Sequence, residues 1–378
     1  MPRVLLVLNE VGAGIGGIEN VGRSLIRLLD AKKSEGVLDY RVASLRGPRT
    51  EADMAELHRS LGNRLTHFSG HRAAFALRVL WSMAAWADVV IFIHMGIASL
   101  LALLPRWVRP ISMTWIHGVE VWSRRGIRQW LGLARSDYVV SNTVYTGNRA
   151  LEANPWLPTP RPCHLGVLPR DEERRVDIAA QIHFLPRQSD ILIVGRLIKG
   201  EGMKGHDRLI DVMPDVIRAM PDARLIVVGT GDNLDFYRNL ANEKGLADHV
   251  IFAGFVEDEV LAELYRRCGV FAMPSRQEGF GLVYLEAMRA GLPCVASNCD
   301  AAQEIVVDGE TGYIVNPDDR VALTSALTRL LNDDELRRKL GNKGRARFLE
   351  HFTEEHFQAR FWRILQEALS VSAEARSN

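Results

Sequence analysis

Residues 275–293 read SRQEGFGLVYLEAMRAGLP, and this stretch decides the fold that the sequence predicts. The apolar residues 270–273, VFAM, precede it and are typical of a short buried strand. After a loop that contains Gly279 and Gly281, apolar residues recur at helical spacing until Gly291. The sequence therefore predicts a strand, a glycine-containing loop and a helix in succession.

This junction between loop and helix is suited to a phosphorylated sugar. The free backbone N–H groups and the positive dipole end at a helix start attract phosphate. The glycines let a ligand approach the backbone closely. Glu278 in the loop and Glu286 in the helix place carboxylates on both sides of the helix start, where they can accept hydrogen bonds from hydroxyls. A nucleotide sugar carries both phosphates and hydroxyls, so we expect a nucleotide-sugar site.

Glu278 and Glu286 are separated by seven residues within EGFGLVYLEAMRAGLPCVAS, and this pattern resembles the signature of retaining glycosyltransferase family 4. The resemblance covers nearly the whole chain, is strongest over residues 191–317, and is of the bacterial envelope or exopolysaccharide type. It implies the α/β GT-B fold, in which two Rossmann-like domains with doubly wound parallel sheets face a cleft. It also implies transfer of a sugar from a nucleoside diphosphate to an acceptor hydroxyl with retained anomeric configuration. Apart from the resemblance, we expect a GDP- or UDP-linked mannose or glucose as the donor. From the unequal charge and the tryptophans described below, we expect a lipid-linked or cell-envelope saccharide as the acceptor.

The resemblance also assigns residues of the second half to the donor. Arg196, just after a predicted strand, and Lys204, before the next predicted helix, resemble the cations with which the family grips the donor diphosphate. Fixed cations lower the barrier because negative charge builds on the departing diphosphate. The eight-residue spacing between them is longer than is usual in the family.

The other donor positions follow from the same resemblance. Glu286 is expected to bind the ribose hydroxyls, and the backbone near Val256 is expected to hold the nucleotide base. Glu278 is expected at the donor sugar, together with backbone groups that bind sugar and phosphate at Gly279, Phe280, Gly281 and Leu282.

Two histidines of the first half each follow a predicted strand. His94 follows residues 88–93, and His117 follows residues 111–116. The carboxyl ends of strands in an open parallel sheet face the ligand crevice, so both positions suit a function. The segment HGVE from His117 resembles the family motif whose histidine lies against the donor sugar near its reacting carbon. His94 is expected on the acceptor side, and residues 142–147 are expected to form a polar loop.

The N-terminal loop gives the main alternative function. Residues 9–17, NEVGAGIGG, match G-x-G-x-x-G after a predicted strand, as in NAD(P)-dependent oxidoreductases. The second predicted strand, near residues 40–45, is followed by Arg46. It lacks the acidic residue that holds the ribose of the dinucleotide in such oxidoreductases. In the resembled family such a loop, here Gly16 and Gly17, closes over donor and acceptor, with Glu19 on the acceptor side. A catalytically idle GT-B scaffold module is a further alternative.

The charge of the chain is distributed unequally. Residues 1–170 hold 21 Lys and Arg against 12 Asp and Glu, a net of +9, whereas residues 171–378 hold 26 against 34, a net of −8. The first segment also carries seven of the eight tryptophans. Arginines interleaved with tryptophans, as in LPRWVRP, suit an anionic membrane surface, although buried tryptophans would give the same pattern. No nucleic-acid module is visible.

Other features predict a cytoplasmic protein, with peripheral contact to the inner face of the cell membrane. The strand-like residues 4–8 follow the initiator methionine directly and leave no room for a signal peptide, and no apolar run has the length of a spanning helix. The four cysteines show no CxxC spacing, which fits a reducing compartment. D-x-D is absent, so we expect a transferase without a metal or another cofactor.

Changes of composition predict the domain boundaries. Residues 1–165 are expected to form an acceptor-side domain, and a linker over residues 166–185 is expected in a proline-rich and charged segment. Residues 186–352 are then the donor domain, and a helix over residues 353–378 is expected to pack back on the first domain. Each domain is long enough to bury a core of its own.

Overall fold

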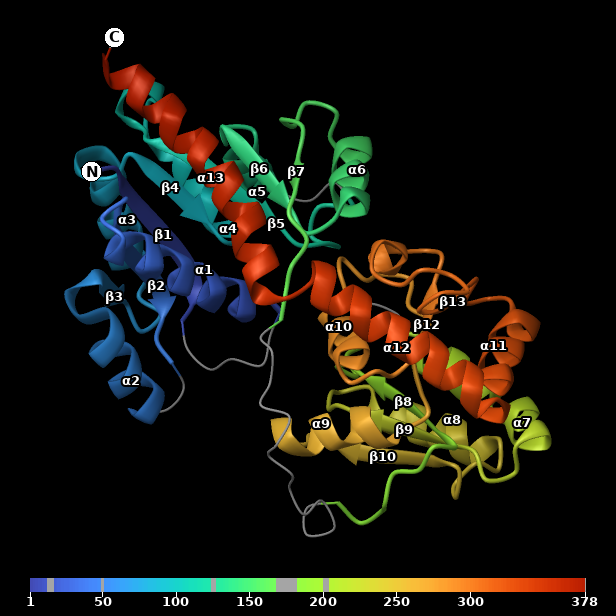
Figure 1. Ribbon diagram of the computed structural model, residues 1–378. Coiled ribbons are helices and arrows are strands. Elements are labelled where there is room, and N and C mark those ends of the chain that lie inside the picture. The colour runs from blue at the N-terminus through green and yellow to red at the C-terminus, as the bar shows by residue number, and fades with distance from the viewer. Residues whose placement is uncertain (12–16, 49–50, 124–126, 168–181, 200–203, 378) are drawn as a thin grey trace. The chain divides into compact units, whose positions relative to one another are not determined.

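The computed structural model describes residues 1–11, 17–48, 51–123, 127–167, 182–199 and 204–377. The chain divides into two compact units, Met1–Leu165 with Glu354–Asn378, and Gly166–Thr353. Each unit is built on a parallel sheet with helices around it (Figure 1). These sheets confirm the expected α/β class with two Rossmann-like domains.

Within the described residues, the sheet of the first unit has seven parallel strands in the order β3-β2-β1-β4-β5-β6-β7. The strands are β1 (Arg3–Glu10), β2 (Asp39–Arg46), β3 (Leu65–His67), β4 (Val89–Phe92), β5 (Ile111–Ile116), β6 (Tyr138–Ser141) and β7 (Arg161–Pro162). Residues 4–8 of β1 are all buried, as expected of a central strand covered on both faces. The strand order reverses between β1 and β4, so the crevice of this unit lies at their carboxyl ends.

The helices of the first unit cover both faces of this sheet. They are α1 (Gly17–Ser34), α2 (Glu51–Leu61), α3 (Arg72–Ala85), α4 (Met95–Ala98), α5 (Ile127–Leu133), α6 (Val144–Ala153) and α13 (Glu354–Ser377), with the 3₁₀ turns η1 (Gly62–Arg64), η2 (Ser99–Leu103) and η3 (Arg106–Val108). The prediction of a loop over residues 142–147 is therefore wrong, because α6 begins at Val144. Thr143 caps the start of α6, because its hydroxyl accepts a hydrogen bond from the N–H of Thr146 at 3.0 Å.

The last helix, α13, belongs to the first unit although it follows the second in sequence. It lies beside β4 and β5 (Figure 1). Phe357 and Phe361 pack on the buried ring of Trp115, with centroids 5.8 and 5.2 Å away. Glu354 at the start of the helix forms an ion pair with Arg27 of α1.

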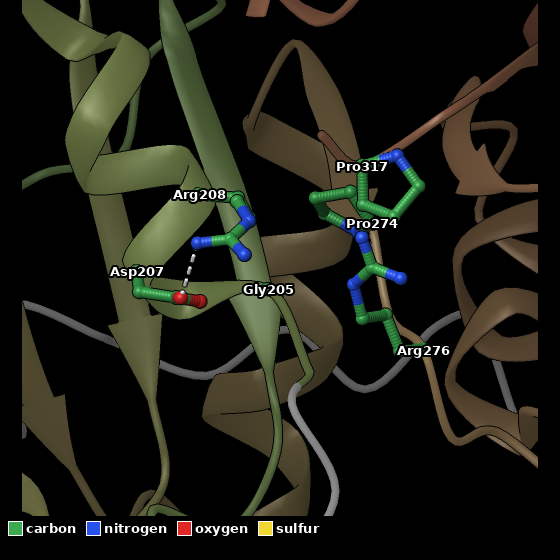
Figure 2. A pocket seen from close by; sticks show the side chains of 6 residues that line it. All are labelled: Gly205, Asp207, Arg208, Pro274, Arg276 and Pro317. Carbon is green, nitrogen blue, oxygen red and sulfur yellow. Dashed lines mark hydrogen bonds and ion pairs between the residues drawn. The ribbon is translucent and has the colours of Figure 1, made fainter. Parts of the chain in front are cut away.

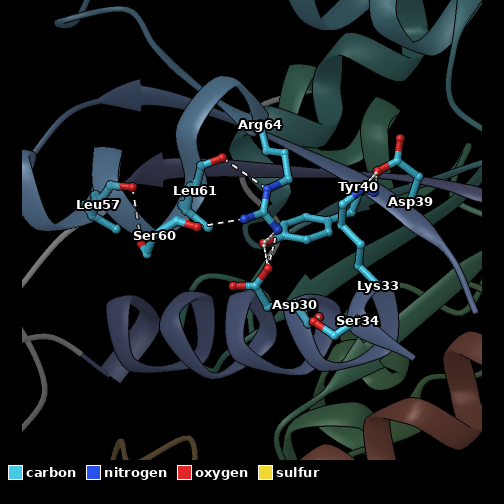
Figure 3. A network of polar contacts seen from close by, with 9 residues as sticks. All are labelled: Asp30, Lys33, Ser34, Asp39, Tyr40, Leu57, Ser60, Leu61 and Arg64. Carbon is cyan, nitrogen blue, oxygen red and sulfur yellow. Dashed lines mark hydrogen bonds and ion pairs between the residues drawn. The ribbon is translucent and has the colours of Figure 1, made fainter. Parts of the chain in front are cut away.

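A polar network ties α1, β2 and η1 together at the amino ends of the strands (Figure 3). The buried Tyr40 donates its hydroxyl to Asp30 at 2.9 Å, and Arg64 ion-pairs with the same carboxylate. Arg64 also donates to the backbone carbonyls of Ser60 and Leu61. Burial and the adjacent Asp30 raise the pKa of Tyr40 well above its usual value, so it remains a neutral donor. The network is at the end of the sheet opposite the crevice, which makes it structural.

Within the described residues, the second unit has six parallel strands in the order β10-β9-β8-β11-β12-β13. The strands are β8 (Asp190–Val194), β9 (Arg224–Val228), β10 (Val250–Gly254), β11 (Val270–Met273), β12 (Cys294–Ser297) and β13 (Gly312–Val315). The helices are α7 (His206–Ala219), α8 (Leu234–Glu243), α9 (Asp258–Arg267), α10 (Leu282–Arg289), α11 (Arg320–Asn332) and α12 (Asp334–His351), with the 3₁₀ turn η5 (Ala301–Glu304). The strand order reverses between β8 and β11, so the crevice of this unit lies where those two strands end.

Within the described ranges, none of the helices combines the length and the apolar character that crossing a bilayer requires.

Candidate functional site

The crevice of the second unit brings together Lys204 and Glu278. Lys204 precedes α7, and Glu278 lies in the loop between β11 and α10. The Lys204 Nζ is 2.6 Å from the Glu278 Oε2, and both side chains are largely buried. Two residues 74 positions apart in sequence, both expected at the donor, are thus direct partners.

A glycine makes this contact possible. Gly205 has a φ of 91° and starts α7 directly against the end of β11. A Cβ on Gly205 would lie 2.6 Å from the carbonyl oxygen of Pro274, which is closer than real Cβ atoms approach. Only a glycine therefore lets the start of α7 lie this close to the loop that carries Glu278.

The loop of Glu278 is held by its own backbone and by the start of α10. The Glu278 Oε1 accepts a hydrogen bond from the N–H of Phe280 at 3.3 Å, and the Phe280 ring is buried. Gly281, with a φ of 96°, precedes Leu282, the first residue of α10. A Cβ on Gly281 would lie 2.5 Å from the Tyr284 ring, so the turn requires glycine. Gly279, which lies between Glu278 and Phe280, is also buried.

Asp300 is a member of this site that sequence reasoning missed. It follows β12 and has no exposed surface. Its Oδ2 accepts a hydrogen bond from the N–H of Glu278 at 3.3 Å, and its Oδ1 accepts one from the N–H of Ala302 at 3.0 Å. Burial, with a smaller contribution from the Glu278 charge, raises the pKa of Asp300 to about 7. The only sequence signal was an acidic residue just after a strand, CDAAQE, which is common.

Glu286, in the middle of α10, has a different partner from Glu278. Its Oε2 accepts a hydrogen bond from the hydroxyl of Tyr265 in α9 at 3.0 Å. Tyr265 is buried, and burial together with Glu286 raises the pKa of its hydroxyl well above the usual value. The Glu286 carboxylate is thereby oriented by a neutral hydrogen-bond donor.

Arg196 lies exposed just after β8, on a backbone that is packed tightly. The N–H of Gly195 donates to the carbonyl of Val228 at 3.0 Å. A Cβ on Gly229 would lie 1.9 Å from the carbonyl oxygen of Gly195. Val256, which was expected near the base, is partly buried in the segment after β10.

A buried histidine follows Lys204. His206, the first residue of α7, is 1% exposed, and its ring lies 5.2 Å from the ring of Tyr237. Among the described residues, no group hydrogen-bonds its Nε2. Burial and the adjacent Lys204 charge lower the pKa of His206 to about 4, so the ring is neutral beside the site.

A small hollow beside the start of α7 is lined in part by the charged side chains of Asp207, Arg208 and Arg276 (Figure 2). Arg208 pairs with Asp207 at 2.8 Å and with Asp318 at 3.1 Å, and Arg276 also pairs with Asp318. The positive charges are thereby matched by carboxylates, and they tie α7 to the segment before α11. The hollow is lined by Gly205, Asp207, Arg208, Pro274, Arg276 and Pro317.

In the first unit, His117 lies at the carboxyl end of β5 with its ring fixed on both sides. Its Nε2 is 2.6 Å from the carbonyl oxygen of Ile93, so Nε2 carries the proton. Its Nδ1 is 3.3 Å from the amide nitrogen of Asn142, whose amide oxygen accepts from the indole N–H of Trp115. Burial lowers the pKa of His117, against the opposing charge of Glu120, so the ring is neutral. Asn142 is thus a partner of His117 and not part of a polar loop.

The remaining first-unit positions lie around the same crevice. The Nδ1 of His94 accepts a hydrogen bond from the N–H of Gly96 at 2.9 Å and caps α4. The charges of His94 and Glu19 both act on His117. Gly17 begins α1 and is exposed, whereas Gly16 is outside the described residues, as is the rest of the loop over residues 12–16.

A search for metal ligands was limited to the described residues, and no cluster of three or more His, Cys, Asp or Glu side chains there could hold an ion.

Sequence comparisons identify relatives over both halves of the chain. The family model for "Glycosyl transferases group 1" matches residues 177–347. The chain is 30% identical over 375 residues to the GDP-mannose-dependent alpha-(1-6)-phosphatidylinositol monomannoside mannosyltransferase of Mycobacterium tuberculosis, a match that covers 91% of this chain and 93% of that protein. It is 38% identical over 184 residues to the Mycolicibacterium smegmatis protein of the same name. This match covers 46% of this chain and 46% of that relative, which is less than half of its length.

Structural comparison gives the same fold. The Anabaena protein HepE in complex with UDP and glucose matches with a TM-score of 0.76 at 18% identity, over 96% of this chain and 99% of that one. The sucrose-phosphate synthase of Thermosynechococcus elongatus matches with a TM-score of 0.74 at 21% identity, over 98% of this chain and all of that one.

Proposed function

This chain belongs to the group 1 glycosyl transferases with the GT-B fold, and on that premise we propose that it transfers mannose from GDP-mannose to a lipid-linked mannoside hydroxyl. The observation that carries the proposal is the pairing of Lys204 with Glu278 where the strand order of the second unit reverses. The relatives with 30–38% identity are GDP-mannose-dependent phosphatidylinositol monomannoside mannosyltransferases by name, which supports the proposed donor and acceptor class.

Cationic groups of the protein would bind the diphosphate of the donor, and carboxylates would bind its hydroxyls. Lys204 and Arg196 would bind the diphosphate, with the N–H groups at the start of α10 as further donors. Glu286, oriented by Tyr265, would accept the ribose hydroxyls. Glu278 would exchange its contact with Lys204 for a hydroxyl of the donor sugar when the diphosphate takes Lys204. This exchange leaves Lys204 paired with an anion and Glu278 hydrogen-bonded in both states.

The reaction would proceed with retention and without a covalent sugar intermediate. The acceptor oxygen would attack the anomeric carbon on the face from which the diphosphate leaves, and a phosphate oxygen would take the acceptor proton. Lys204 and Arg196 would stabilise the charge that builds on the leaving group. His117, neutral and fixed by Ile93 and Asn142, would contact the sugar without adding a charge. These steps need no metal ion from the protein.

We also propose a membrane-docking surface on the first unit, because the acceptor would be a lipid. Leu77 and Trp81, four residues apart on α3, are 69% and 53% exposed, and α3 contacts η2. Leu103 and Trp107, from η2 and η3, are 64% and 87% exposed. Arg78 lies over the Trp81 ring, and the exposed Arg106 precedes Trp107. Exposed indoles next to arginines suit an interface with anionic lipid.

The tryptophans of the basic segment divide between core and surface. Trp115 and Trp130 are buried, and Trp86 and Trp122 are partly buried. Trp156, at 50% exposure, lies against Trp130 and is the remaining exposed indole. The docking surface therefore uses Trp81 and Trp107 and not the whole set.

A ligand-binding screen tests the donor. Purified protein is heated with GDP, UDP, ADP, GDP-mannose, UDP-glucose or NAD(P)H without added metal, and the unfolding midpoint is recorded. A ligand that binds only the native state raises the midpoint with its affinity, and we expect the largest shift with GDP compounds. A shift with NAD(P)H alone would overturn the proposal in favour of an oxidoreductase, and no shift with any nucleotide would favour a scaffold module.

A further inference from the structure

Asp300 and the residue after it hold the backbone of Glu278 through hydrogen bonds. Asp300 follows β12, the strand next to β11, and is completely buried. Its carboxylate accepts the N–H of Glu278, and the N–H of the next residue, Ala301, donates to the Glu278 carbonyl at 3.1 Å. Both backbone polar groups of Glu278 are thus bound by two consecutive residues. These contacts between the segments that follow β12 and β11 help to fix where the backbone of Glu278 lies.

The polar contacts of Asp300 continue through Glu278 to Lys204, the cation of the site. The side chain of Glu278 contacts Lys204 at 2.6 Å, so Asp300, Glu278 and Lys204 form a continuous chain of polar contacts. Ser275, near the start of the same loop, is fully buried, and its side chain lowers the pKa of Asp300, which partly offsets the effect of burial. The Asp300 carboxylate therefore lies against two positions of the loop, Ser275 and Glu278.

The ionised form is the one that can hold these contacts. A carboxylate accepts at both oxygens, whereas a protonated carboxyl has a hydrogen on one of them that would face either the N–H of Glu278 or that of Ala302. The titratable groups that face Asp300 are Glu278 from the loop and Tyr284 from α10. Tyr284 is neutral, since burial raises its pKa well above the usual value and its hydroxyl donates to the carbonyl of Met273.

We propose that Asp300 is a positioning residue: its carboxylate fixes Glu278, and through it Lys204, in the geometry that the donor requires. This inference rests on the proposed function, because it assigns the donor to Lys204 and Glu278. A pKa of about 7 means that a fraction of the Asp300 carboxyl groups is protonated near neutral pH, and the protonated form has a hydrogen on one of its two acceptor oxygens. The simpler role, a cap for η5, concerns only the contact to Ala302 and would leave Glu278 unaffected.

The substitution Asp300→Asn separates these roles. An asparagine of the same shape has one acceptor oxygen, and its amide hydrogens then face a backbone N–H. The matched control is Asp319→Asn, because Asp319 also accepts a backbone N–H, from Ala322 at 2.9 Å, but is exposed and caps α11. Circular dichroism and the unfolding midpoint of each variant establish that it is folded.

The test is the pH profile of mannose transfer from GDP-mannose between pH 5.5 and 8.5. For the wild type and Asp319→Asn, we expect kcat/KM to fall as pH decreases through about 7. For Asp300→Asn, we expect kcat/KM at pH 8 to be about 10- to 100-fold lower, as a misplaced binding group implies, and the acid limb to be absent. A variant that retains the wild-type activity and acid limb would overturn the inference, whereas a wild type without any transfer would overturn the proposed function.

A second readout does not depend on the donor. Amide hydrogen exchange of residues 275–281, corrected for the intrinsic rate at each pH, reports the opening of the loop. At pH 8, where the wild-type carboxylate is ionised, we expect about 10-fold less protection in Asp300→Asn than in the wild type and in Asp319→Asn, because a hydrogen bond to a carboxylate is lost. Equal protection of this loop in the wild type and in Asp300→Asn would contradict a positioning role.

Discussion

Burial sets the charge of single residues in and beside the proposed donor site. Asp300 and His206 are both buried within the second unit, and burial disfavours the ionised form of each, so the pKa of Asp300 rises to about 7 and that of His206 falls to about 4. Their effects on stability have opposite signs. The raised pKa of Asp300 favours the folded state at low pH. The lowered pKa of His206 favours the folded state at high pH.

The substitution His206→Gln should make the protein less sensitive to acid. The unfolded chain binds a proton at this histidine below its usual pKa of about 6.5, whereas the folded chain does so only near pH 4. The stability that the neutral ring contributes is therefore present above pH 6.5 and is lost as pH falls to 4, by about 3 kcal/mol for a fully retained shift. Urea unfolding at pH 7 and at pH 4.5 measures the difference.

The control for this prediction is His71→Gln, because His71 is exposed. We expect the loss of stability between the two pH values to be unchanged in the control and clearly smaller in His206→Gln. An equal loss in His206→Gln and in the wild type would show that His206 is not buried in its neutral form.

Among the elements, α3 and η3 carry the proposed membrane-docking surface, so removing their exposed side chains should weaken lipid binding. We expect the double variant Trp81→Ala with Trp107→Ala to bind vesicles of phosphatidylglycerol and phosphatidylcholine at least about 10-fold more weakly, since two interfacial indoles are lost. Binding of the wild type should fall with added salt, because arginines contribute. Vesicle cosedimentation measures both effects.

Phe236→Ala is the matched control, since Phe236 is similarly exposed, at 55%, but lies in the second unit. Equal vesicle binding by the wild type and by the tryptophan variant, with the control unchanged, would rule out this surface as the docking site.

The elements that sequence analysis predicted best are the central strands. Residues 270–273 are a continuous apolar run and residues 111–116 are largely apolar, as expected of parallel strands that are covered on both faces, and the structure has strands with these bounds. β3 and β7 were not predicted because they are edge strands of three and two residues without such a run. For α6, the helix start at Thr143 was missed because its capping hydroxyl was taken for loop polarity.

The site could be predicted where one segment supplies the chemistry. Glu278, Gly281 and Glu286 lie within nine residues, so strand, turn and helix patterns bring them together. The contacts of Asp300 and of Asn142 depend on which strands are neighbours in the folded sheets, and single-sequence patterns contain no such information. The roles of the predicted donor residues are still proposals.

At the scale of the whole molecule, each unit has one crevice-forming reversal of strand order, and the chain returns to its first unit through α13. The basic net charge lies in the segment that forms most of the first unit, and the acidic net charge lies in the remainder. This distribution agrees with an anionic lipid surface for the first unit. The central claim is mannose transfer to a lipid-linked acceptor.

The most direct test of this claim is transfer of labelled mannose from GDP-mannose to a phosphatidylinositol mannoside in vesicles, without added metal. We predict a labelled lipid product with retained anomeric configuration from the wild type. Glu286→Ala should raise the KM for the donor about 10-fold or more, and Arg196→Ala should mainly lower kcat, because the first binds the ground state and the second the leaving charge. Arg208→Ala, a cation outside the site, serves as the control. Undiminished transfer by both site variants, or no product from the wild type, would contradict the account.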